Sequence, residues 1–93
     1  MVREQISNDL DRAVNSGLIR KPYNKHRFTL RTDYIFIHVA IYCNEYKWGS
    51  GMYFQYSNSF STMIRIPTNE YSYRRLANEI RKARKKHDKD YKE

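Results

Sequence analysis

The chain has 93 residues, which suffice for a single domain (residues 1–93) with one modest hydrophobic core. It carries 18 Lys and Arg against 10 Asp and Glu, a net charge of +8 that predicts an anionic partner, either nucleic acid or an acidic protein surface. The single cysteine, Cys43, excludes an internal disulfide and suits a reducing compartment. No apolar run is long enough to span a membrane and the first residues do not resemble a signal peptide, so we expect a cytoplasmic protein without membrane contact.

The first predicted element is a helix over residues 2–16. Ile6, Leu10 and Ala13 recur at the spacing of one helical stripe, with polar residues between them. Gly17 follows at a position where many helices end in a left-handed residue, and Leu18 is placed to fold back onto the last turn. Pro22 opposes any continuation of the helix.

Residues 20–27 are predicted to form a basic loop. Lys21, Lys25 and Arg27 are candidate contacts to a nucleic-acid backbone, and Tyr23 among them could stack on a base. The alternative is an ordinary exposed loop whose charges serve solubility.

Residues 28–66 are rich in strand-forming residues. We expect a short strand over 28–31, a long one over 34–43, and two more over 52–56 and 61–66, separated by turns at 44–51 and 57–59. Pro67 ends the last strand. Short connections between consecutive strands predict an antiparallel meander of three to four strands.

The long strand alternates between two kinds of side chain. Its aliphatic face, Ile35, Ile37, Val39 and Ile41, is expected to pack on the helices. Its aromatic face then either binds a partner, a nucleic acid or a second copy of the chain, or forms a second core face. The partner-binding candidates on this face are Tyr34, Phe36 and Tyr42.

The turn over 44–51 contains two large aromatic residues, Tyr46 and the only tryptophan, Trp48. Exposed at a loop tip, they would anchor a protein partner. The alternative is that they fold back as a lid over a small core.

A second helix is predicted over residues 69–87, capped by Thr68 or Asn69, with residues 89–93 as a frayed tail. Leu76, Ala77 and Ile80 lie on its apolar face, and nearly all charges on the opposite side are positive. That side is either a solvated surface or a phosphate-binding one, because Lys and Arg both pair with phosphate oxygens. The candidate phosphate contacts are Arg74, Arg75, Arg81, Lys82 and Lys85.

The expected fold is therefore α+β, in the order helix, three- to four-stranded antiparallel meander, helix, with both helices on one sheet face. This order is similar to that of double-stranded-RNA-binding domains. Those domains open their last helix with a basic, Gly-containing segment, whereas Pro67-Thr68-Asn69-Glu70 occupies that place here, so the order by itself assigns no family.

Catalytic readings find little support in the spacing of the residues. Asp33, Glu45 and Lys47 imitate the carboxylate and lysine pattern of a metal-dependent nuclease, but a strand over 34–43 would place the two carboxylates about 40 Å apart. The three histidines lie in different elements without ligand partners at metal-binding spacing. We therefore expect no enzyme, no metal and no cofactor.

The leading hypothesis is a non-catalytic nucleic-acid-binding module that uses the basic carboxyl-terminal helix and the basic loop. The alternative is a small protein inhibitor, of the kind encoded by phages and mobile elements, which binds a host nucleic-acid enzyme through aromatic and basic surfaces. A homodimer through the aromatic sheet face is a further expectation.

Overall fold

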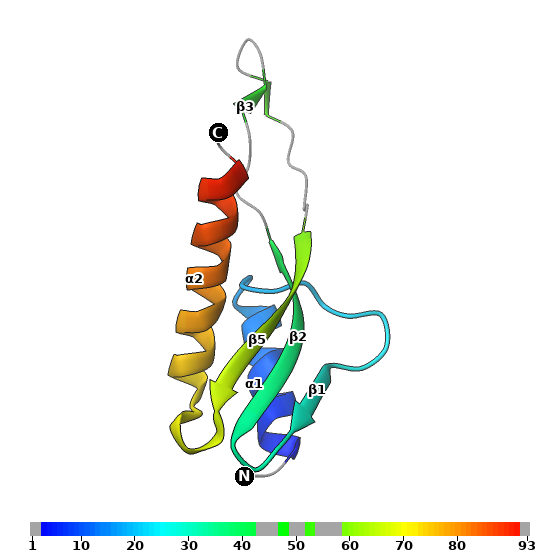
Figure 1. Cartoon of the computed structure of the whole chain (residues 1–93). Helices are drawn as coiled ribbons and strands as arrows, with labels where there is room; N and C mark the ends of the chain where they lie inside the picture. The colour runs from blue at the N-terminus through cyan, green and yellow to red at the C-terminus, as the bar shows by residue number, and fades with distance from the viewer. Residues whose placement is uncertain (1–2, 43–46, 49–51, 54–58, 92–93) are drawn as a thin grey trace.

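The computed structural model describes residues 3–42, 47–48, 52–53 and 59–91, with side chains for 3–42 and 59–87 (Figure 1). The elements in chain order are α1 (Arg3–Asn15), β1 (Arg27–Leu30), β2 (Tyr34–Tyr42), β3 (Lys47–Trp48), β4 (Met52–Tyr53), β5 (Ser59–Pro67), the short 3-10 helix η1 (Thr68–Glu70) and α2 (Tyr73–Tyr91).

The main sheet is a three-stranded antiparallel meander in the order β1-β2-β5. The strand expected over 52–56 is not part of this sheet, because β4 pairs with β3 in a separate two-stranded sheet and β5 pairs directly with β2. β5 pairs with β2 because the two strands match in length and in the positions of their apolar side chains. Each strand has nine residues, and their full-length register sets apolar side chains opposite one another, as in the pair of Ile35 and Ile66.

Both helices cover the same face of the sheet, as predicted. Ile6 and Leu10 of α1 and Leu76 and Ile80 of α2 are fully or almost fully buried. They belong to one core cluster with the aliphatic face of β2 and with two isoleucines of β5. The strand residues of this cluster are Ile35, Ile37, Val39, Ile41, Ile64 and Ile66.

The end of α1 follows the sequence prediction closely. Gly17 has φ 76°, a left-handed conformation that costs other residues energy but not glycine. The Gly17 amide donates to the Val14 carbonyl and the Leu18 amide to the Ala13 carbonyl, both at 3.0 Å. This pair of bonds is the Schellman motif, which satisfies the carbonyls at the end of the helix.

The start of α2 differs from the prediction. Residues 68–70 form η1, and α2 begins only at Tyr73, where Ser72 replaces Thr68 or Asn69 as the cap: its Oγ accepts a 3.0 Å hydrogen bond from the Arg75 amide. The helix continues through Tyr91, past the expected end at residue 87.

A tertiary contact accounts for this late start. The buried Tyr71, in an extended conformation, donates a 2.8 Å hydrogen bond from its hydroxyl to Oδ2 of Asp9 in α1. Burial, followed by this hydrogen bond and the negative charge of Asp9, raises the pKa of Tyr71. The phenol therefore stays neutral, and it fixes the turn before α2 to the first helix.

Candidate nucleic-acid interface

The helices pack on one face of the sheet, and we call the opposite face the open face. Side chains alternate along a strand, so the burial of Ile35 and Ile37 beneath the helices places Tyr34 and Phe36 on the open face. The predicted aromatic residues of β2 are half-buried there, and His38 is exposed. From Tyr34 to Tyr42 this face extends about 26 Å along β2.

The neighbouring strands add cations to the open face. Phe36 lies opposite Arg65 of β5, and His38 lies opposite Arg27 of β1. The Arg65 guanidinium carbon is 4.8 Å from the centroid of the Tyr34 ring, and the Tyr34 and Phe36 centroids are 6.3 Å apart. Arg27 and Arg65 are both exposed.

Carboxylates are absent from the sequences of the three strands that form the main sheet. Arg65 and Met63, the latter 50% exposed, were not singled out from the sequence. Side chains alternate along β5, so the burial of Ile64 and Ile66 in the core places Met63 and Arg65 on the open face. This inference requires knowing that β5 pairs with β2.

The basic loop projects from the edge of the sheet between two segments that pair with β2. Ile19 pairs with Ile41, and the Arg20 amide donates a 2.7 Å hydrogen bond to the Ala40 carbonyl. Pairing along the same edge of β2 resumes where Arg27 meets His38. Residues 21–26 therefore loop out between two paired segments, which holds their ends at the edge of β2 (Figure 1).

Side chains of this loop are presented to solvent. Lys21 and Lys25 are exposed, and Tyr23 is 99% exposed. A hollow of about 510 Å³ separates the loop from the sheet, lined by Tyr23 on one side and by His38 on the other. Lys21 also lines this hollow, whereas Lys25 lines a hollow between the loop and α1.

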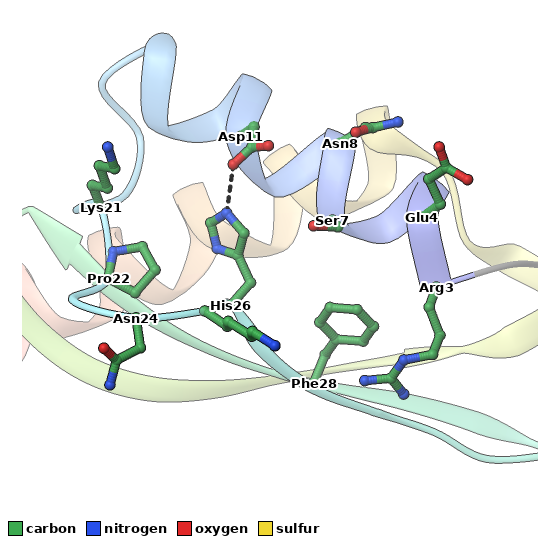
Figure 2. A pocket seen from close by; sticks show the side chains of 11 residues that line it. Arg3, Glu4, Ser7, Asn8, Asp11, Lys21, Pro22, Asn24, His26 and Phe28 are labelled. Atoms are coloured by element: carbon green, nitrogen blue, oxygen red, sulfur yellow. Dashed lines mark hydrogen bonds and ion pairs between the residues drawn. The ribbon is translucent and has the colours of Figure 1, made fainter.

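A second hollow, of about 520 Å³, lies between the loop and α1 (Figure 2). His26 Nε2 is 2.7 Å from Oδ1 of Asp11, an interaction that ties the loop to the helix. Ser7 lines the same hollow, but within the described chain no hydrogen bond joins it to His26. The three residues therefore lack the contact between nucleophile and base that a catalytic triad needs.

The predicted cations of α2 lie on its outer face, away from the sheet. Arg74, Arg81, Lys82 and Lys85 are exposed. Arg75 differs from these four, because its guanidinium donates to Glu70 at 2.7 Å and to Glu79 at 3.1 Å. These hydrogen bonds, that to Glu70 first, raise the pKa of Arg75 and engage it within the molecule.

The basic loop and α2 do not form one combined surface. α2 packs mainly against β5, at one edge of the sheet, whereas the loop emerges beside β1, at the other edge (Figure 1). The structure therefore places the predicted helix cations and the predicted loop cations apart, and their role in binding stays a prediction.

Some predicted residues lie outside the described part of the chain. Cys43 and Tyr46 are among them, and for Trp48 only the backbone is described, as part of β3. The expectation that Tyr46 and Trp48 form a binding anchor stays a prediction.

Among the described residues, no cluster of three His, Cys, Asp or Glu side chains could hold a metal ion. No described helix is long and apolar enough to cross a membrane. Comparison of the chain with protein-family models, with curated proteins and with solved structures finds no match.

Proposed function

We propose that this protein is a non-catalytic nucleic-acid-binding module that holds a single strand across the open face of its sheet. The observation that carries the proposal is the composition of this face. Tyr34, Phe36 and Tyr42 lie in a row with Arg27 and Arg65 beside them, and the three strands contain no Asp or Glu. Such a surface offers aromatic rings to bases and positive charge to phosphates.

The division of labour follows from the position of each group. Unstacked bases would lie on Tyr34 and Phe36, since stacking tolerates any base and gives little sequence preference. Arg27 and Arg65, on the flanking strands, would pair with the backbone phosphates. Lys21 and Lys25 would continue the backbone contacts onto the loop.

A duplex suits this face less well than a single strand. Its bases are stacked on one another, so the rings of the open face could reach only its backbone. The proposal therefore predicts a preference for single-stranded over double-stranded nucleic acid, which pure charge attraction would not give.

The test is fluorescence anisotropy of labelled DNA and RNA strands of about 12 nucleotides, and of the matching duplexes, across a salt series. We expect the wild-type chain to prefer single strands. Phe36→Ala should weaken single-strand binding by about 1–3 kcal/mol, or roughly 5- to 150-fold, with an unchanged salt slope because no charge is removed. Thr29→Ala is the matched control, since Thr29 is exposed on β1 directly opposite Phe36 but has no ring.

Two results would contradict the proposal. Equal affinity for strand and duplex together with an unaffected Phe36→Ala variant would remove the open face from the interface. Self-association in sedimentation that Phe36→Ala abolishes, without nucleic-acid binding, would assign the face to a second copy of the chain.

A further inference from the structure

A second positive surface, outside the proposed site, is the outer face of α2. At about 100° per residue, Arg74, Arg81, Lys82, Lys85 and Lys86 fall within an arc of about 140°. All five are exposed, and they extend about 18 Å along the helix. The proposed function leaves this surface without a role.

Within residues 3–42 and 59–87, whose side chains the structure describes, little of this charge is neutralised. Lys82 Nζ lies 3.7 Å from Glu79, whose carboxylate also accepts the hydrogen bond from Arg75. Among the side chains that the structure describes, no carboxylate forms an ion pair with Arg81 or Lys85. Like charges on neighbouring turns destabilise a helix, so the arrangement is unfavourable unless an anion covers it.

The direction of this surface separates it from the open face. α2 buries Leu76, Ala77 and Ile80 toward the sheet, so its cations point away from the sheet. The open face points in the opposite direction, because the core lies between the sheet and the helices. One extended segment of nucleic acid cannot contact both surfaces without bending around the edge of the molecule.

The two surfaces also differ in chemistry. Within the exposed arc of α2 the described residues are cations and Asn78, with no aromatic ring. Such a surface contacts phosphates and does not need unstacked bases, so it accepts the backbone of a duplex.

We propose that the outer face of α2 binds the backbone of a second nucleic-acid segment, so that one molecule bridges a single strand and a duplex. This inference rests on the proposed function, which supplies the first segment. It adds an activity that neither surface has alone, the joining of two nucleic acids.

The experiment uses a biotinylated strand of about 12 nucleotides on beads, loaded with the full chain, and then a fluorescent duplex of about 20 base pairs at about 50 mM salt. The wild-type chain should capture the duplex on the beads. Arg81→Ala with Lys85→Ala should bind the strand normally but capture at least about ten-fold less duplex, because two phosphate contacts contribute a salt slope of about 1.8. The matched double variant, Lys21→Ala with Lys25→Ala, also removes two exposed positive charges and should mainly weaken binding to the single-stranded nucleic acid.

The outcomes separate the two proposals. A loaded strand that captures no duplex, or a duplex that displaces the strand, overturns bridging and leaves single-strand binding intact. Equal duplex capture by wild type and by the α2 variant also overturns it, since bridging would then arise elsewhere. If the wild-type chain does not bind the strand at all, both proposals fail.

Discussion

The open face of the sheet and the outer face of α2 are both positively charged, but the residues around the charges differ. On the open face Arg65 lies over the ring of Tyr34, and Phe36 lies opposite Arg65 on the neighbouring strand. On α2 the exposed cations have other polar residues beside them. Positive charge alone suits a nucleic-acid backbone, whereas aromatic rings among the charges also suit bases.

The largest expected effect tests which face of β2 is covered. Ile37→Ala should lower the free energy of unfolding by about 2–5 kcal/mol, because Ile37 is fully buried and its truncation leaves a cavity. Phe36→Ala, one residue away on the open face, should cost clearly less. Urea unfolding of both variants measures the difference, and a larger loss for Phe36→Ala would mean that the open face is covered.

The next effect separates the two positive surfaces by salt dependence. Removal of Lys21 and Lys25 together should flatten the log–log salt slope of single-strand binding by about 1.4, at about 0.7 for each phosphate contact. Removal of Arg81 and Lys85 should leave that slope unchanged, because they face away from the open face and from the nucleic acid bound there. Anisotropy between about 50 and 200 mM salt gives both slopes, and equal flattening by the two variants would merge the surfaces into one site.

A third prediction concerns the contact that fixes α2 to α1, away from both surfaces. Tyr71→Phe removes the hydrogen bond to Asp9 and should lower stability by about 0.5–1.5 kcal/mol while both binding activities remain.

The same residue gives a pH test. Because the folded state raises the pKa of Tyr71 above its ordinary value near 10, the contribution of the neutral phenol is fully present below pH 10 and is lost as pH rises beyond it. Wild type should therefore lose more stability than Tyr71→Phe between about pH 9 and 11, as measured by urea unfolding. An equal loss of stability in the two proteins over this pH range would show that folding does not raise the pKa of Tyr71.

The smallest expected effect is on the stability of the α2 variant. Arg81→Ala with Lys85→Ala should change the free energy of unfolding by no more than about 0.5 kcal/mol, since both side chains are exposed and alanine favours the helix. A loss above about 1 kcal/mol would indicate that these side chains stabilise the fold, and the bridging experiment would then need Arg74→Ala with Lys86→Ala instead.

Patterns within single segments of the sequence determined the faces of β2, the buried sides of the helices and the end of α1. The alternation of β2 predicted both of its faces, the stripes of the two helices predicted their buried sides, and Gly17 predicted the end of α1. These features depend on residues a few positions apart, so a single sequence contains all the information they need.

How these segments combine depends on contacts between residues far apart in the sequence. The pairing of β5 with β2, which brings Arg65 onto the open face, depends on competition among strands far apart in the chain. The late start of α2 depends on Tyr71 reaching Asp9, and the separation of the basic loop from α2 depends on which edge of the sheet each adjoins. Local periodicity does not encode these choices, because each is set by which distant surfaces bury the most apolar area together.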